Sequence, residues 1–575
     1  VVNTLPITLH QKGEQNFDLS KLFLNKEGKQ AKGAEEAKVT IEYTNNPSWL
    51  MVKALPAISN PTEEDALSLM AAIYANTLSR HIQKTLNVNA KDIDDASGLA
   101  SASDTLQKKV NKYVALLKKL QNKDGSFSWW KGMSGSRYMT TAVAEMMVRL
   151  NAIVGRQSST ASMLSGAIDY LRQQTAREVK AMKEDEAKAA QKAARNGKKG
   201  EAYQATPSEM ALHYLYIVAM DGTCVKLKAP ALNDMDYLLG KLKKMTGSLT
   251  IYGKAKAAVI LALNYDYKTA ADYLKSMEEY SVYREDMGRY YDTRKAYYSW
   301  RNYKIPTEVA AIEALQALDA QSIAAISSAS SAISKQQTIE EMQRWLLMSK
   351  RTQVWDTPVN TVDAVYAFMK GNESNWNRRA ENAVLKLDGK QLPMPQDSTT
   401  LGYVKTEKTG KASVLSIDKK SEYTSWGAVY AEFKQPISEI GSMESGIKVR
   451  RVIVPAESES KGKAQAKVGE KVKVTLIITA DRDYDFVQIT DKRAACLEPV
   501  NRKSGYQWGI GCYVSPRDHA TNFYFDRLSK GKHIVEMEYY VDRKGDYQSG
   551  TCTAECTYSP EFGGRTETYE LRVNN

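Results

Sequence analysis

Histidine and cysteine are scarce in this 575-residue chain, which has five of each. No two of the five histidines stand at the spacing of metal ligands. The sequence also has no HExxH motif, no GxSxG motif and no glycine-rich phosphate loop before a helix. Since the usual catalytic and ligand-binding signatures are missing, we expect a protein that is not an enzyme and that uses no metal or cofactor.

Long apolar runs are also absent, since no stretch of eighteen or more apolar residues occurs. We therefore expect no transmembrane helix. The first residues, VVNTLPITLH, have neither the basic start nor the apolar core of a signal peptide, and the chain has no initiator methionine. This pattern predicts a fragment or processed form, in which any membrane attachment would run through a missing N-terminal anchor.

The charges are not segregated by sign, although the net charge is +13 and the pI is about 9.1. Lys and Arg total 80 against 67 Asp and Glu, and the two signs are mixed along the chain. The densest basic stretch, residues 177–199, interleaves Glu, Lys and Ala at helical spacing. That pattern is typical of a solvated helix with i,i+4 pairs, so we expect no nucleic-acid partner.

The hydrophobic pattern changes its period twice along the chain. Residues 1–45 alternate apolar and polar side chains, which predicts strands. The pattern then becomes helical as far as about Gly371. From about Val384 it returns to a period of two, and Asp388-Gly389 predicts a two-residue hairpin turn. The predicted helices are 64–86, 100–120, 138–153, 161–194, 207–220, 252–263, 307–318, 339–348 and 361–370.

Several predicted helices, such as 141–152 and 254–264, are apolar on more than one face. A helix of this kind must be buried on two sides, which favours an inner ring of helices surrounded by an outer ring. Residues 280–300 alternate aromatic and polar side chains, which predicts a hairpin that projects from the helices. All of this helical sequence lies between β segments, so we expect one β-sandwich split by an inserted helical domain and followed by another β domain.

Local signals add two narrower predictions within the helical region. Thr206 before Pro207 and Glu209 predicts a helix with Thr206 as its N-cap. After the polar turn at 121–126, the large rings of Phe127, Trp129 and Trp130 are expected to pack in the core.

Six segments, in the same order, resemble the C-terminal part of bacterial alpha-2-macroglobulin-like proteins, and the resemblance covers nearly the whole chain. They are TIEYTNNPSWLMVKALP (40–56), YANTLSRHI (74–82), LQNKDGSFSWWKG (120–132), KVGEKVKVTLIITADRDYDFVQITD (467–491), TNFYFDRLSKGKHIVEMEY (521–539) and YSPEFGG (558–564). The resemblance implies a multidomain α and β fold. Residues 1–46 and 372–440 would form a CUB-type β-sandwich, 47–371 an α/α toroid of the thioester-domain type, and 441–575 a macroglobulin-like β-sandwich of the receptor-binding type.

The family's reactive segment has lost its two reactive residues in this sequence. In the family, a short run after a Pro contains a Cys and, three residues later, a Gln, and their side chains form an internal thioester. Here the run after Pro61 has Asp65 and Ser68 at those positions, and a register shifted by one residue supplies no Cys either. A carboxylate and a hydroxyl cannot form the thioester, so we expect no covalent capture of a protease.

The resemblance implies an exported endopeptidase inhibitor of the periplasm or cell envelope, with proteases as its targets. Without the thioester, inhibition would proceed by non-covalent conformational trapping. The alternative is an envelope scaffold or protein-binding module with no protease chemistry, whose partner would contact the last β domain and the hairpin at 280–300.

A third hypothesis comes from residues 92–95, which match the DxDD acid motif of terpene cyclases, enzymes that also use an α/α toroid.

Four cysteines, Cys496, Cys512, Cys552 and Cys556, cluster in the last predicted domain. Cys552 and Cys556 would share one face of a strand at a separation of roughly 13 Å, too far apart to bond each other. An exported location would permit disulfides from these residues to Cys496 or Cys512, and buried free thiols are the alternative.

Overall fold

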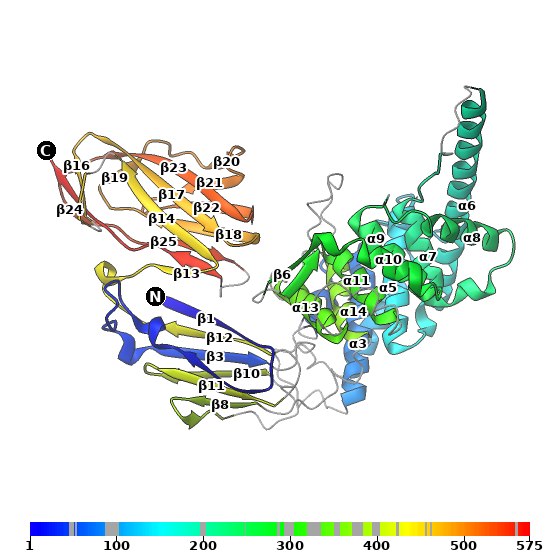
Figure 1. Cartoon of the computed structure of the whole chain (residues 1–575), viewed down its shortest axis with the longest axis horizontal. Helices are drawn as coiled ribbons and strands as arrows, with labels where there is room; N and C mark the ends of the chain where they lie inside the picture. Colours follow the sequence, from blue (N-terminus) through cyan, green and yellow to red (C-terminus); the bar gives the residue numbers. More distant parts are fainter. Residues whose placement is uncertain are drawn as a thin grey trace. The chain divides into compact units, whose positions relative to one another are not determined.

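The computed structural model describes residues 1–44, 51, 54–86, 103–195, 203–247, 249–284, 288–291, 304–318, 335–349, 357–370, 383–393, 403–420, 425–454, 457–460, 463–557 and 562–575. The chain divides into two compact units, one of residues 1–45 with 380–575 and the other of residues 46–379. The first unit is built from strands and the second mainly from helices (Figure 1). The predicted class, a multidomain protein with a helical middle region flanked by β-sheets, is confirmed at this level. In the described part of the chain, every helix is too short or too polar to span a bilayer.

Strands from before and after the helical region share two four-stranded sheets. The first sheet has the order β1 (Val2–Leu9), β12 (Ser425–Glu432), β3 (Lys38–Thr44) and β10 (Tyr403–Thr409). The second has the order β2 (Gly13–Asp18), β11 (Val414–Lys419), β8 (Val384–Leu387) and β9 (Lys390–Gln391). All of these pairs are antiparallel. The chain therefore leaves this pair of sheets after β3 and returns to pair with β3 again at β10 and β12.

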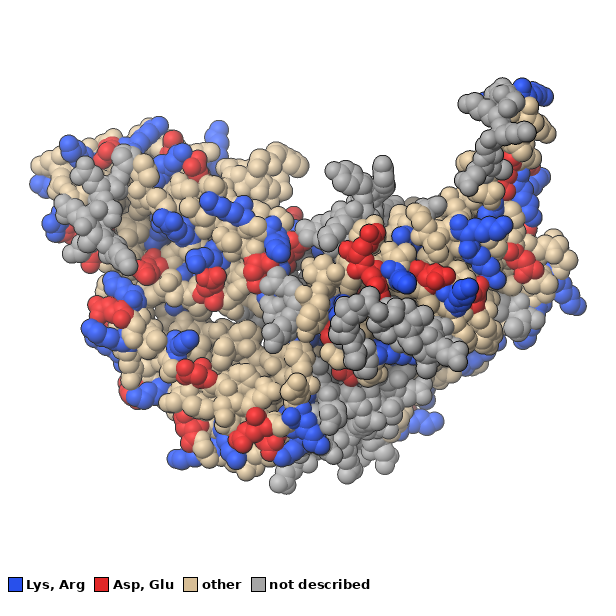
Figure 2. Space-filling model, in the orientation of Figure 1, with Lys and Arg blue, Asp and Glu red and all other residues tan. Residues whose placement is uncertain are grey.

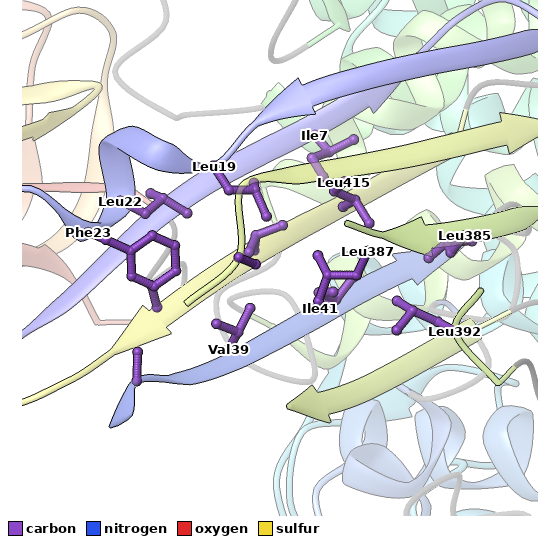
Figure 3. Close-up of a cluster of buried hydrophobic side chains, with 14 of the residues drawn as sticks. Ile7, Leu19, Leu22, Phe23, Val39, Ile41, Leu385, Leu387, Leu392 and Leu415 are labelled. Carbon is purple, nitrogen blue, oxygen red and sulfur yellow. The ribbon is translucent and has the colours of Figure 1, made fainter. Parts of the chain in front are cut away.

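The inward side chains of these strands form one buried core (Figure 3). Its members come from both sides of the helical region, and they include Ile7, Leu9, Val39, Ile41, Leu385, Leu387, Leu415, Ile417 and Val429. The alternation of buried and exposed residues follows the period of two seen in the sequence. Between β8 and β9, Asp388 (φ 50°) and Gly389 (φ 78°) both lie in the left-handed region, which confirms the predicted two-residue turn.

The rest of the first unit forms three further sheets. A seven-stranded sheet has the order β13 (Met443–Ser445), β26 (Gly563–Arg565), β25 (Cys552–Cys556), β18 (Tyr484–Lys492), β22 (Ala520–Leu528), β21 (Cys512–Pro516) and β20 (Gly505–Gln507). A four-stranded sheet contains β14 (Ile447–Val454), β17 (Lys471–Ala480), β23 (Gly531–Val541) and β19 (Leu497–Pro499). Another contains β15 (Glu457–Ser460), β16 (Lys463–Lys467), β27 (Glu570–Asn574) and β24 (Gly545–Gln548).

In the helical unit, six of the described helices contact one another in a closed cycle. In order, they are α3 (Ala66–Leu86), α5 (Arg137–Val154), α7 (Glu209–Asp221), α9 (Ile251–Leu263), α11 (Lys304–Ala317) and α14 (Pro358–Met369), and α14 contacts α3 again. Nearly all of α9 is buried, as expected for a helix with neighbours on both sides.

Other helices pack around this cycle of six, which we call the inner ring (Figure 1). On α3, α5, α9 and α11 lie α4 (Ser103–Lys118), α6 (Ser158–Arg195), α10 (Tyr267–Lys275) and α13 (Lys335–Met348), while α8 (Ala231–Leu242) contacts α6 and the short α2 (Leu55–Ser59) contacts α3. The nine predicted helices are present. Helices α2, α8 and α10, which have 5, 12 and 9 residues, were not predicted from the sequence. The far end of α6 is exposed, as its mixed charges predicted.

Two local predictions in the helical unit are wrong. The N-cap of α7 is Ser208, whose Oγ accepts a hydrogen bond from Ala211 N, and not Thr206. Glu178 accepts from both the backbone N–H and the hydroxyl of Ser208, which fixes the helix start two residues later. Phe127 is buried as predicted, but Trp129 and Trp130 are 44% and 39% exposed. The short hairpin of β4 (Phe127–Ser128) and β5 (Gly135–Ser136) buries only the first ring, and the chain turns outward before the others.

Within the described residues, the hairpin predicted at 280–300 is present as β6 (Ser281–Arg284) and β7 (Gly288–Tyr291), and residues 285–287 and 292–300 lie outside them. Instead of projecting freely, it packs on α13. Tyr290 stacks on Trp345 at a ring-centroid distance of 5.4 Å, and Arg289 pairs with Glu341 at 2.9 Å. The backbone N–H of Tyr291 donates to Glu308 on α11 at 3.3 Å.

Glu308 is buried where this hairpin meets α11. Its Oε1 has no hydrogen-bond partner within the described part of the chain. Burial therefore raises the pKa of Glu308 well above its ordinary value, although the Tyr291 N–H and Arg289 partly oppose this. The carboxyl stays protonated in the folded protein to a higher pH than in the unfolded chain.

We expect Glu308→Gln to stabilise the protein at pH 7–8. The unfolded wild-type chain releases this proton above about pH 4.5, so the wild type loses stability as pH rises from there through the folded pKa. The Gln side chain can accept the hydrogen bond from Tyr291 N–H, and it has no carboxyl proton whose retention in the folded state lowers stability. The gain should be near zero below about pH 4 and reach about 1 kcal/mol or more at pH 8.

Urea denaturation of both proteins between pH 4 and pH 8 measures this difference, with the exposed Glu279→Gln as the matched control. A gain that does not change with pH would contradict the role given to the Glu308 proton.

Candidate functional site

The first candidate site is the start of α3, where the resemblance predicts the degenerate thioester positions Asp65 and Ser68. Asp65 precedes the helix and acts as its N-cap. Its Oδ1 accepts hydrogen bonds from Leu67 N at 2.9 Å and Ser68 N at 3.1 Å. The Asp65 side chain is buried, and Ser68 lies half-buried in the first turn. The carboxylate therefore stabilises the helix N-terminus, where unsatisfied N–H groups favour a negative charge.

The β4–β5 hairpin and the residues after it lie beside this helix start. The carbonyl of Trp129 accepts a hydrogen bond from Ala66 N at 3.2 Å. The hydroxyl of Ser128 donates to the carbonyl of Met133 at 2.6 Å and so closes the loop. Four large apolar side chains in this segment are exposed: Trp129, Trp130, Met133 and Tyr138. The start of α3 thus has an exposed aromatic border and no cysteine.

The second candidate site lies among the inner-ring helices, where ionisable side chains are buried together. We call it the axial cluster. Its ionisable and phenolic members are Tyr74 on α3, Glu145 and Arg149 on α5, His213 and Tyr216 on α7, Tyr252 and Lys256 on α9, Glu313 on α11, and Asp363 and Tyr366 on α14. Every helix of the inner ring contributes at least one residue.

Arg149 contacts carboxylates from three helices. Its guanidinium pairs with Asp363, lies 3.1 Å from Glu145 and 3.7 Å from Glu313, and is 3% exposed. It donates to the Tyr216 hydroxyl at 3.1 Å. Glu313 in turn accepts hydrogen bonds from the hydroxyls of Tyr216 (2.8 Å) and Tyr366 (2.6 Å). Buried charges of this kind are tolerated only when paired and hydrogen-bonded, as they are here.

Glu145 connects Arg149 to the other half of the axial cluster, which consists of Lys256, His213 and Tyr252. One of its oxygens accepts from Lys256 Nζ at 2.6 Å, and the other contacts His213 Nδ1. The second ring nitrogen of His213 lies 3.0 Å from the Tyr252 hydroxyl. Glu145, His213 and Tyr252 therefore form a carboxylate–imidazole–hydroxyl chain, but burial raises the pKa of Tyr252 well above its ordinary value, which makes its hydroxyl a poor nucleophile.

The pKa shifts follow from burial and from these pairs. Burial alone would raise the pKa of Glu145, but His213, Lys256 and Arg149 outweigh it and hold the pKa well below its ordinary value. Burial also raises the pKa of Asp363, which Arg149 only partly offsets, and lowers that of Lys256. Burial opposes the charge on Arg149 too, yet its partners, Asp363 first, raise its pKa well above the ordinary value. The axial cluster is therefore held together by ion pairs and hydrogen bonds between buried side chains.

The axial cluster was not predicted from the sequence. A signal was present: Glu145, Arg149 and Lys256 stand in helices that are otherwise apolar on most faces. A charged residue on a helix that has no polar face is expected to be buried, and a buried charge predicts a partner of opposite charge. The acidic run at 92–95, by contrast, lies outside the described residues.

The four described cysteines of the first unit, Cys496, Cys512, Cys552 and Cys556, are buried and not joined by disulfide bonds. Burial raises the pKa of Cys496 and of Cys512 to about 11 and that of Cys552 well above the ordinary value, so these thiols stay protonated at neutral pH. Cys552 and Cys556 lie on the same face of β25, as predicted. A disulfide among these cysteines stays a prediction.

A closed helical ring joined to a strand-built unit defines a multidomain α and β protein, and the comparisons identify its relatives. Residues 446–561 match the family model described as the bacterial alpha-2-macroglobulin MG10 domain. The match confirms the resemblance to the C-terminal region of bacterial alpha-2-macroglobulins, with an MG10-type domain in these residues. Asp65 and Ser68 lie outside the matched stretch.

Solved structures and curated proteins give further similarities. Native alpha-2-macroglobulin from Escherichia coli, spanning MG7 to the C-terminus, aligns over 100% of this chain and 82% of that one, with 11% identity and a TM-score of 0.40. The trypsin-activated Escherichia coli protein aligns over 100% and 36%, with 12% identity and a TM-score of 0.37. Circularly permutated Ras protein 2 of Dictyostelium discoideum is 22% identical over 214 residues, which are 34% of this chain and 5% of that protein. The chain thus covers only a small part of that curated relative.

We expect Asp65→Ala to destabilise the helical unit by about 1 kcal/mol, because it removes the side-chain cap of α3. Asp65→Asn keeps an acceptor oxygen and should cost only a few tenths of a kcal/mol. Chemical denaturation followed by far-UV circular dichroism measures both. Equal losses for the two variants would mean that the cap does not act through its hydrogen bonds.

Arg149→Met should destabilise the helical unit by about 3–5 kcal/mol, because Glu313 and Asp363 would lose the cation that offsets their burial. Arg172→Met, which breaks the exposed pair with Asp169 on α6, should cost about 0–1 kcal/mol. Thermal and urea unfolding of the two variants give the comparison. Similar losses at both positions would show that the axial cluster has no special role.

Proposed function

We propose that this chain is the C-terminal part of an alpha-2-macroglobulin-like endopeptidase inhibitor that traps proteases non-covalently, by a conformational change and without a thioester. Its domains would be a CUB-type β-sandwich (1–46 and 372–440), a thioester-type α/α toroid (47–371) and a terminal macroglobulin-like sandwich (441–575). The protein would be exported to the periplasm or cell envelope.

The observation that carries the proposal is the MG10 match at residues 446–561. Two features of the fold support it. The helical unit is inserted between strands of a single pair of sheets, because β3 pairs with both β10 and β12. The inner ring is closed, as an α/α toroid requires. Together these give the order of elements expected for the C-terminal part of such an inhibitor.

The start of α3 supports the non-covalent part of the proposal. Neither Asp65 nor Ser68 offers an electrophile, and the Asp65 carboxylate already caps α3. Trp129 and Trp130 instead expose apolar surface beside the helix start. A protease, or another domain of the same protein, would be held there by burial of these rings, with no bond to form.

A second candidate function is an envelope scaffold without protease chemistry, and one feature of the last β domain favours it. Tyr506, Tyr513 and Tyr524 lie opposite one another on three adjacent strands, and each is at least 40% exposed. Trp508 is 87% exposed and meets Tyr506 edge-on at a centroid distance of 4.7 Å. Exposed aromatic side chains in a row are typical of a protein-contact surface.

The test is a protease assay on the full-length protein. A panel of endopeptidases, beginning with trypsin, is incubated with the protein and then offered a large protein substrate and a small chromogenic peptide. Steric trapping predicts that cleavage of the large substrate falls several-fold while cleavage of the peptide persists, because a trapped protease keeps its active site. A scaffold predicts that neither changes.

Methylamine separates the non-covalent mechanism from the covalent one. An internal thioester would take up the amine, so the mass of this protein should stay constant after treatment. A gain of one methylamine per chain would overturn the assignment of Asp65 and Ser68 as degenerate positions, whatever the protease assay shows.

A further inference from the structure

A groove on the helical unit, separate from both candidate sites, lies between α6, α7 and α8. Helix α6 contacts both α7 and α8, and Figure 1 shows the three helices side by side. The loop of residues 226–230 closes one side. The groove has a volume of about 510 Å³. That volume lies within the range of about 300–1,000 Å³ typical of ligand sites.

The floor of the groove is apolar. Ile168 on α6 and Tyr214 on α7 are buried there, and Ala176, Leu227 and Pro230 add apolar surface. Burial raises the pKa of Tyr214 to about 12, so its phenol stays neutral across the physiological range. The floor is thus suited to an aliphatic or aromatic side chain and places no negative charge against it.

Charged side chains line the rim, with an excess of positive charge. Four cations, Arg156, Arg172, Lys226 and Lys228, face three carboxylates, Asp169, Asp221 and Asp234. Asp169 pairs with Arg172 at 3.0 Å, and Asp234 with Lys183, just outside the groove, at 3.7 Å. Burial raises the pKa of Asp221, and Arg156 and Lys226 act against this shift. Among the residues that line the groove, four cations therefore outnumber three carboxylates by one.

The first turn of α8 borders the groove. Pro230 and Ala231 both line it, and Asp234 in the same turn adds one of the three carboxylates. The excess of cations favours an anion that lies against an apolar floor.

We propose that this groove binds an apolar group that carries a carboxylate, as in the free C-terminus of a peptide that ends in a hydrophobic residue. The terminal side chain would cover Ile168 and Tyr214, and the carboxylate would pair with Arg156, Lys226 or Lys228 on the rim. Free fatty acids share this chemistry and are the second possible source. The site is independent of the proposed protease inhibition, since it uses neither α3 nor the β4–β5 hairpin.

The test uses the complete chain and a fluorescein-labelled hexapeptide that ends in leucine. Fluorescence anisotropy is measured with the free acid and with the C-terminal amide, which has the same side chains but no carboxylate. The free acid should bind about tenfold or more tightly than the amide, because a charge-assisted pair is lost in the amide. Unlabelled octanoate is then added as a competitor.

Two variants test the location. Arg156→Gln/Lys226→Gln/Lys228→Gln removes the rim charge, and Lys108→Gln/Lys119→Gln/Lys268→Gln is the matched control with three exposed lysines elsewhere on the same unit. Ala176→Trp fills the groove, and Ala187→Trp places the same ring on the exposed part of α6. Each groove variant should weaken binding about tenfold or more, and neither control should change it.

Binding that depends on the carboxylate and on both groove variants supports the proposal. Displacement of the peptide by octanoate, or binding of octanoate without the peptide, would identify a small carboxylate as the ligand within the same chemical class. Equal binding of acid and amide, equal effects of Ala176→Trp and Ala187→Trp, or no binding of either probe would overturn it. Circular dichroism of each variant confirms that the helices are intact.

Discussion

The helical unit depends on Arg149, a buried guanidinium that contacts carboxylates from α5, α11 and α14. Removing an ion from water is costly, and the cost is offset only when hydrogen-bonded partners of opposite charge are held in place. Two of the partners, Glu313 and Asp363, come from helices far apart from α5 in the sequence, so these pairs can form only when the inner ring is closed. The same residues that would destabilise an open arrangement therefore favour the closed one.

The axial cluster also explains why the inner-ring helices differ from ordinary amphipathic helices. Each is apolar on more than one face, since it has neighbours on both sides, and apolar packing alone specifies helix position only loosely. A carboxylate and a cation must meet within hydrogen-bond distance, which fixes how far each helix can rotate or slide. Tyr216 and Tyr366 extend this effect, because their hydroxyls both donate to Glu313.

The two candidate surfaces of the helical unit, the aromatic segment beside Asp65 and the groove between α6, α7 and α8, lie outside the axial cluster. The first has exposed aromatic rings, and the second has an apolar floor with a cationic rim. Under the proposed function, contact with a protease at the first surface would be non-covalent, since the start of α3 has neither a cysteine nor a glutamine.

The sequence by itself determined the order of the elements, because local periodicity is a property of neighbouring residues. It predicted nine of the described helices and the hairpin turn at Asp388-Gly389, whereas the replacement of the thioester residues by Asp65 and Ser68 stays a prediction. Helix boundaries could not be predicted from neighbouring residues alone. Thr206 and Ser208 are both good N-cap residues, and the hydrogen bonds that Ser208 donates to Glu178, thirty residues away, decide between them.

Tertiary structure alone decided which side chains meet. Trp129 and Trp130 are as apolar as Phe127, yet the turn after Ser128 leaves them exposed, which no local pattern reveals. The partners of Arg149 lie up to 214 residues away along the chain. Periodicity indicates that a helix face is buried. It does not identify the partner of a buried side chain, because the distance between the two side chains is fixed only when the inner ring closes.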